Sequence, residues 1–124
     1  MDVYERIKKR HPWGKHAIVE ASMGLNREAG EVEDLVAKSL FEDQPIVPGA
    51  LMVELSDVWH YLAMACAVYG ITLEQLGEIN RVKLMARDAG IERRFDELIE
   101  KLDPEMDVNQ QINDIEDHVE MMRW

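Results

Sequence analysis

Apolar residues recur along most of the chain at steps of three, four and seven, which is the period of amphipathic helices. We find no sustained alternation of apolar and polar residues of the kind that predicts strands. The pattern therefore predicts a protein built of helices joined by short connectors. The predicted helices span residues 3–10, 15–41, 50–69, 72–89, 91–102 and 108–122.

Local signals mark several ends of these helices. Prolines in the connector 42–49 stop the growth of the long helix, and Gly70 and Gly90 suit the position just after a helix end. Thr72 and Gln75 have the spacing of a capping box. In the long helix, the apolar stripe expected to face the rest of the protein consists of Ile18, Leu25, Ala29, Val32 and Val36.

The predicted fold class is all-α, an antiparallel four-helix-type bundle with an additional C-terminal helical segment. We assign residues 1–90 to the bundle and 91–124 to the extension, which is expected to pack on the bundle or in an oligomer interface. Residues 92–124 hold 11 acidic and 4 basic residues, so they carry −7 of the net charge of −11. The last helix has a coiled-coil-like apolar seam of Val108, Ile112, Ile115, Val119 and Met122.

The composition limits the classes of function. A chain of 124 residues is long enough for one domain with one hydrophobic core, and a hydrophobic content of 47% is enough for it to fold. A net charge of −11 disfavours binding to nucleic acid or to a membrane surface, because phosphate groups are repelled. The single cysteine, Cys66, excludes an intrachain disulfide and a cysteine-based zinc cluster, and it favours a cytoplasmic location.

Residues 50–69 are the most apolar stretch, and their length suits a membrane span. Glu54, Asp57 and His60 lie within this stretch, and no basic cluster flanks it. We therefore interpret it as a buried helix of a soluble bundle. The N-terminal residues 1–10 are charged and lack the apolar core of a signal peptide.

Two pairs of acidic residues carry the candidate chemistry. Glu28 and Glu31 are three apart on the long helix, and Glu54 and Asp57 are three apart on the apolar helix, so each pair shares a helix face. The second pair points toward the apolar side of its helix, where an unpaired ionised carboxylate costs several kcal/mol. Residues 50–80 contain no basic residue that would compensate for this cost.

Binding of divalent metal ions best explains how these unpaired carboxylates are compensated. Mg²⁺ prefers carboxylate oxygens and keeps water and substrate phosphates among its ligands, and Mn²⁺ can substitute for it. On facing antiparallel helices the two pairs would bring four carboxylates into one small volume, which would attract a magnesium-bound triphosphate. In the alternative interpretation all four are solvated or line a polar seam, since acidic residues are common and a lone E-x-x-E carries almost no information.

At these residues the sequence resembles the MazG-like family of all-α nucleotide pyrophosphohydrolases. The family pattern is E-x-x-E, a spacer, and E-x-x-D. It reads here as Glu28-Ala-Gly-Glu31 and, after 22 intervening residues, Glu54-Leu-Ser-Asp57. The surrounding segments LNREAGEVEDLV and ELSDVWHYLAMACAVYGITLEQLGEINRVKL also match, and the resemblance covers roughly residues 13–88.

The resemblance implies a Mg²⁺-dependent enzyme that removes unwanted nucleotides by hydrolysing a nucleoside triphosphate to a monophosphate and pyrophosphate. Asn80 and Lys83 match family positions that contact phosphate or sugar. Arg27 departs from the family, because many members have a second consecutive Glu there. The catalytic metal ligands implied by the resemblance are Glu28, Glu31, Glu54 and Asp57.

Further candidates for substrate binding come from the residues themselves. Asn80, Lys83 and Arg87 fall at i, i+3 and i+7 on one side of their helix, where the two cations suit a triphosphate. Arg87 equally suits the C-terminal end of a helix dipole. Lys38 lies on the acidic side of the long helix and is a candidate for phosphate contact. Trp13 either stacks on a base or staples two helices.

Two alternatives to this function stay open. Phosphoribosyl-ATP pyrophosphohydrolase is similar in helical fold and acidic pattern. A non-catalytic helical interaction module would explain the seam over 108–122 and the net charge. Beside a small-molecule nucleotide, we expect a second copy of the chain as partner, in a homodimer or homotetramer. The helix over 50–69 has more apolar surface than one short bundle can cover.

Overall fold

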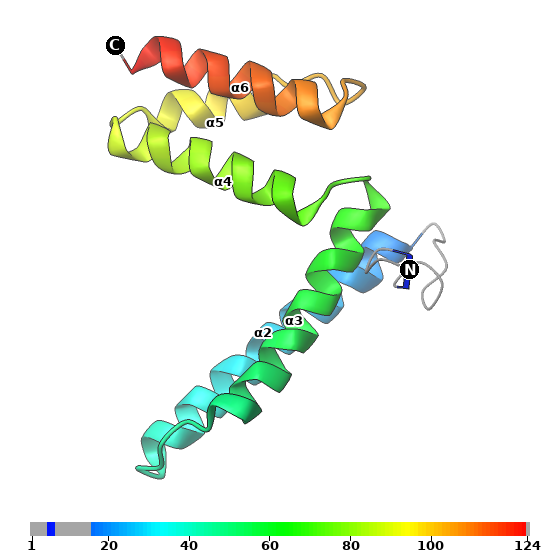
Figure 1. The fold of residues 1–124 in the computed structure, drawn as a ribbon, viewed down its shortest axis with the longest axis vertical. Coiled ribbons are helices and arrows are strands. Elements are labelled where there is room, and N and C mark those ends of the chain that lie inside the picture. Colours follow the sequence, from blue (N-terminus) through cyan, green and yellow to red (C-terminus); the bar gives the residue numbers. More distant parts are fainter. Residues whose placement is uncertain (1–4, 7–15, 124) are drawn as a thin grey trace. The chain divides into compact units, whose positions relative to one another are not determined.

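The computed structural model describes residues 5–6 and 16–123, and all regular secondary structure in these residues is helical. The predicted all-α class is therefore confirmed, and most helix ends lie within two residues of their predicted positions. Most of the predicted helix over 3–10, and Trp13, lie outside the described residues. The five helices, shown in Figure 1, are α2 (Ala17–Phe41), α3 (Pro48–Val68), α4 (Leu73–Asp88), α5 (Glu92–Glu100) and α6 (Val108–Met122).

The chain divides into two compact units, Met1–Gly70 and Ile71–Trp124. The first contains α2 and α3, and the second contains α4, α5 and α6. The boundary that we expected near residue 90 thus falls inside the second unit. The reason is that α4 shares its apolar core with α5 and α6, so α4 belongs with the acidic C-terminal helices.

In the first unit, α2 and α3 lie side by side as a helical hairpin (Figure 1). No member of the apolar stripe predicted for α2 is fully buried: Ala29 is exposed, and the other four members are half-buried. Small residues form the contact line instead, since they let two helix backbones approach closely. The buried residues of the hairpin are Ala17, Ala21 and Gly24 in α2 and Ala63, Met64 and Cys66 in α3.

Gly24 makes the closest approach within the hairpin. A Cβ at this position would overlap the ring of Tyr61, so a side chain larger than hydrogen does not fit there. Further toward the chain's N-terminus in α2, Ala21 packs with Ala63 and Met64. Because antiparallel helices keep their register, the turns of α2 that follow Gly24 face the turns of α3 that precede Tyr61.

The helix ends follow the local signals in the sequence. Gly70 and Gly90 adopt φ values of 66° and 72°, the left-handed region that glycine occupies without strain. Thr72 and Gln75 form the predicted capping box, with both reciprocal hydrogen bonds present. Pro48 occupies the first turn of α3, where its missing N–H has no partner to lose.

The second unit has a core of its own, drawn from all three of its helices. The seam predicted in the last helix packs here, because Ile115 and Val119 contact α4 and α5. The buried members of this core are Val82, Ala86, Phe95, Ile115 and Val119. The apolar face of α6 is therefore used inside this unit.

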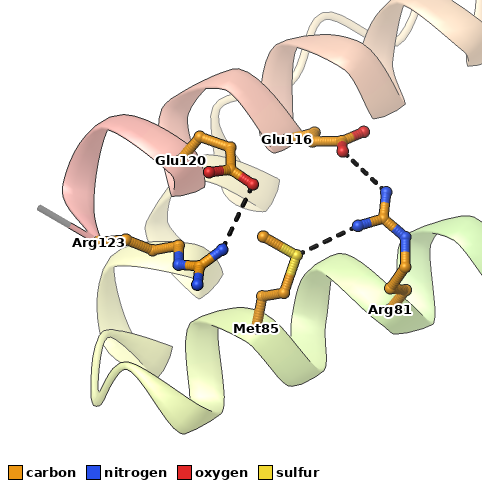
Figure 2. A network of polar contacts seen from close by, with 5 residues as sticks. All are labelled: Arg81, Met85, Glu116, Glu120 and Arg123. Atoms are coloured by element: carbon orange, nitrogen blue, oxygen red, sulfur yellow. Dashed lines mark hydrogen bonds and ion pairs between the residues drawn. The ribbon is translucent and has the colours of Figure 1, made fainter.

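Polar contacts at the edge of this core join α4 to α6 (Figure 2). Arg81 Nη2 lies 2.8 Å from Glu116 Oε1, and Arg81 Nη1 donates to the sulfur of Met85 at 3.2 Å. On α6 and its C-cap, Arg123 pairs with Glu120 at 3.5 Å. The pair of Arg81 with Glu116 joins the two helices, but both ion pairs are solvated and stabilise the unit little.

The hairpin leaves many apolar side chains exposed. On α3 these are Met52 (66% exposed), Val53 (60%), Leu55 (47%) and Trp59 (43%). Among residues 5–6 and 16–123, α3 is the one helix long enough and apolar enough to cross a membrane. Core helices of soluble proteins share these properties. α2 alone therefore does not cover the whole apolar surface of α3.

Candidate metal centre

Four carboxylates from the two helices of the hairpin converge on one small volume. One carboxylate oxygen from each of Glu28, Glu31, Glu54 and Asp57 lies within 4.8 Å of all the others. The spacing of three residues puts both members of each pair on the side that faces the other helix. The convergence expected from the sequence is therefore present in the structure.

The register of the hairpin explains why these four residues meet. Gly24 lies against Tyr61. Glu28 follows Gly24 by one helical turn in α2. Because the two helices are antiparallel, Glu28 lies opposite the turn of α3 that precedes Tyr61. Small residues at the preceding contacts hold the helices close enough for the acidic side chains to reach one another. The acidic cluster thus continues the same contact line as the small residues.

Two oxygens of the cluster lack the partners that buried polar atoms usually have. Glu28 Oε2 and Glu54 Oε2 are shielded from solvent and accept no hydrogen bond. The Glu28 side chain as a whole is 12% exposed. An ionised carboxylate can only accept hydrogen bonds, so four ionised carboxylates cannot form hydrogen bonds with one another. Each buried unpaired oxygen costs free energy unless a proton or a cation binds between the groups.

This crowding affects Glu31, an exposed member of the cluster. Its pKa is raised, first by a hydrogen bond with Glu28, then by the charge of Glu28, with Glu54 adding in the same direction. A raised pKa means that the cluster holds a proton more tightly than an isolated carboxyl does. The crowding of negative charge that raises this pKa also attracts a cation.

The donor set fits a hard divalent cation. It consists of carboxylate oxygens alone, two of them buried and unpartnered, on two helices that hold them close together. Mg²⁺ and Mn²⁺ prefer such oxygens, whereas a zinc site would favour histidine or cysteine. The four residues would hold the cation and leave its outer side to water or to a ligand from solvent.

One cation of the chain lies at the edge of the cluster. Arg27 Nε is 3.4 Å from Glu28 Oε1, and Arg27 Nη2 donates to the hydroxyl of Tyr61 at 3.1 Å. Both contacts raise the pKa of the Arg27 guanidinium, which stays charged, and the contact with Glu28 contributes most. In the sequence, Arg27 stands out only as a departure from a family pattern. The missed signal is the register that places Tyr61 opposite Gly24, one turn from the acidic pair.

The predicted substrate-binding residues lie elsewhere in the chain. Lys38 is exposed in the last turn of α2. Asn80, Lys83 and Arg87 are exposed on α4 in the second unit, where Lys83 and Arg87 line a hollow of about 450 Å³. The other residues lining this hollow are Glu92, Phe95 and Asp96 of α5. Its two cations therefore share the hollow with two acids.

Fold and site together define an all-helical protein with a four-carboxylate cluster on a helical hairpin. Compared with protein-family models, with curated proteins and with solved structures, the chain gives no match. The likeness to the MazG-like family accordingly rests on the motif residues of the sequence, and the function has to be argued from the site.

Proposed function

We propose that the protein is a Mg²⁺-dependent nucleoside triphosphate pyrophosphohydrolase of the MazG-like type, which cleaves a (d)NTP to a (d)NMP and pyrophosphate. The observation that carries the proposal is the meeting of four carboxylates from two helices within 4.8 Å, with two of their oxygens buried and unpartnered. A merely solvated acidic face would leave its oxygens in water.

In this proposal each acid has a stated task. Glu28 and Glu54, the more buried members, fix the position of the cation. Glu31 and Asp57 complete its ligands. A cation held by these residues would supply positive charge to offset that of the phosphates and would polarise a water for attack.

The substrate's phosphates need cationic partners in so acidic a protein. Lys83 and Arg87, which line the hollow on α4, and Asn80, one turn before Lys83, stay proposed phosphate contacts on the strength of the sequence motif alone. A guanidinium is suited to bind two phosphate oxygens at once, and a lysine supplies a point charge. Lys38 is retained as a further phosphate contact and Trp13 as a stacking partner for the base.

We further propose that the protein works as a homodimer or homotetramer in the cytoplasm. The exposed apolar side chains of α3, among them Met52, Val53 and Trp59, support a second copy as partner, since contiguous exposed apolar surface usually marks an interface. Light scattering at micromolar concentration should give a multiple of the 14.4 kDa chain mass. A monomer would contradict the proposed assembly.

The experiment that tests the activity is an assay of the purified protein with Mg²⁺ and a panel of canonical and modified (d)NTPs, detecting monophosphate and pyrophosphate. Asp57→Asn should fold but lose turnover, because one ligand is gone. Glu33→Gln, an exposed acid of α2 outside the cluster, serves as the matched control and should keep full turnover. If the wild type releases no pyrophosphate from any of these substrates, the proposed activity is wrong.

The same assay separates the alternatives. Phosphoribosyl-ATP belongs in the substrate panel, and its exclusive turnover would favour that related hydrolase. The interaction module was suggested by the seam of α6, but Ile115 and Val119 are buried inside the second unit. Such a module should show no Mn²⁺ binding that depends on Glu54, so a calorimetric titration of the wild type and Glu54→Gln distinguishes it.

A further inference from the structure

Arg27 is held in a defined place by contacts to both helices of the hairpin. Its Nε lies 3.4 Å from Glu28 Oε1, and its Nη2 donates to Tyr61 at 3.1 Å. Its guanidinium carbon also lies 5.5 Å from the centre of the Tyr61 ring, within the range of a cation–π contact. Tyr61 itself is fixed by packing against Gly24.

These contacts leave the guanidinium able to bind an anion. An arginine has five N–H groups, and two of them serve the contacts with Glu28 and Tyr61. The contact with Glu28 is long, and the Arg27 side chain is 59% exposed, so the ion pair is weak. A stronger anion can therefore replace the Glu28 carboxylate at little cost, while the Tyr61 hydroxyl keeps the guanidinium in place.

The space beside Arg27 is suited to a ligand. The residue lines a hollow of about 400 Å³ on the hairpin of α2 and α3. A group in this hollow would contact the guanidinium, which in turn contacts Glu28 of the cluster. The residues lining the hollow are His16, Val19, Glu20, Met23, Arg27 and Tyr61.

We propose that Arg27 is a substrate-binding residue, whose guanidinium leaves Glu28 and binds a phosphate group of the nucleotide beside the metal centre, and that Tyr61 is the positioning residue that aims it. This inference rests on the proposed function. The planar guanidinium can bind two oxygens of a phosphate at once. Its contact with Glu28, through one nitrogen at 3.4 Å, does not use this geometry. When a divalent cation occupies the carboxylates, Glu28 has a better partner and Arg27 is released for the phosphate.

The test uses the full chain, with Mn²⁺ alone and then inorganic pyrophosphate in the presence of Mn²⁺ as calorimetric probes. Arg27→Gln should weaken pyrophosphate binding roughly tenfold, as expected for loss of a hydrogen-bonded charge. Its affinity for Mn²⁺ alone should stay equal or rise. Arg27→Lys should restore part of the loss, and Tyr61→Phe should lose a smaller part than Arg27→Gln.

Steady-state kinetics on the best (d)NTP provide the second readout. Arg27→Gln should raise KM about tenfold with a smaller change in kcat, and it should leave the thermal midpoint unchanged, which a purely structural role would not do. Arg93→Gln, a charge loss on α5 at a side chain that is 95% exposed, is the control and should behave as the wild type. Wild-type values of KM and pyrophosphate affinity in Arg27→Gln would overturn the role of Arg27 and leave the proposed activity standing. A wild type without metal-dependent turnover would overturn both.

Discussion

Tyr61 in α3 packs its ring against Gly24 in α2, so closely that a methyl group at residue 24 would overlap the ring. This contact sets the distance between the two helices one turn away from the acidic cluster. It also holds the phenol whose hydroxyl accepts a hydrogen bond from Arg27. The geometry of the candidate centre therefore depends on a residue without a side chain.

The substitution Gly24→Ala should destabilise the hairpin by about 1–3 kcal/mol, because Tyr61 must move or the helices must separate. Denaturant unfolding followed by circular dichroism measures this change. Gly30→Ala in the same helix is the control, since a Cβ at residue 30 meets nothing within 4 Å. Its higher helix propensity should stabilise the protein by up to about 1 kcal/mol. Equal effects of the two substitutions would contradict the close contact.

Divalent cations should stabilise the folded protein through the carboxylate cluster. At a hundredfold excess over the dissociation constant, a ligand that binds only the native state adds about 2.7 kcal/mol to the free energy of unfolding. Thermal unfolding with and without Mg²⁺ or Mn²⁺ should therefore show a higher midpoint with the metal. The shift should vanish in Glu54→Gln and persist in Glu33→Gln, which lies outside the cluster. A shift of the same size in Glu54→Gln would remove Glu54 from the site.

The pH dependence of stability should reveal the crowded carboxylates in metal-free protein. Because the pKa of Glu31 is raised in the folded state, the native protein binds more protons than the unfolded chain at pH values between the ordinary pKa of 4.5 and the raised one. Stability is then lost as the pH rises through this window, and the penalty stays fully present at higher pH. Below the ordinary pKa the carboxyl is protonated in both states and contributes nothing.

Thermal unfolding at several pH values between about 5 and 7.5 tests this relation. The wild type should lose more stability over this range than Glu31→Gln, whose amide does not titrate. Saturating Mg²⁺ should flatten the wild-type curve, since the cation replaces the proton. The general acidity of the chain affects both variants, so it cancels in the comparison. If the two proteins lose stability equally over this pH range, the neighbouring carboxylates do not raise the pKa of Glu31.

The ion pair between Arg81 and Glu116 should contribute little to stability despite its length of 2.8 Å (Figure 2). Their side chains are 54% and 32% exposed, so water and salt screen the attraction. A double-mutant cycle with Arg81→Ala and Glu116→Ala should give a coupling free energy of about 1 kcal/mol or less. A coupling well above this value would mean that the pair is shielded more than its exposure indicates.

Local signals in the sequence were sufficient for the helix ends. The capping box of Thr72 with Gln75 and the left-handed Gly70 depend on neighbours within a few residues, so the sequence alone specifies them. The approach of the two acidic pairs was also within reach, because a spacing of three fixes a shared helix face. For the same reason the all-α class followed from the periodicity.

The contacts between helices were harder to foresee. The stripe predicted for α2 gave weight to Leu25 and Ala29, whereas Ala21 and Gly24 make the contact. Hydrophobicity does not reveal where two backbones approach, since that depends on the partner's large residue, here Tyr61. The bridge from Arg27 to Tyr61 spans 34 residues and follows from the same register, which no local pattern specifies.

Each cluster carboxylate stands more than one helical turn from the nearest end of its helix. Fraying, which affects the last turns of helices, does not reach them. The loss of conformational entropy needed to gather four ligands is thus incurred during folding of the chain rather than on capture of an ion. Such a preorganised cage should accept its ion without rearrangement of the backbone, at a rate set by how quickly the ion sheds its water.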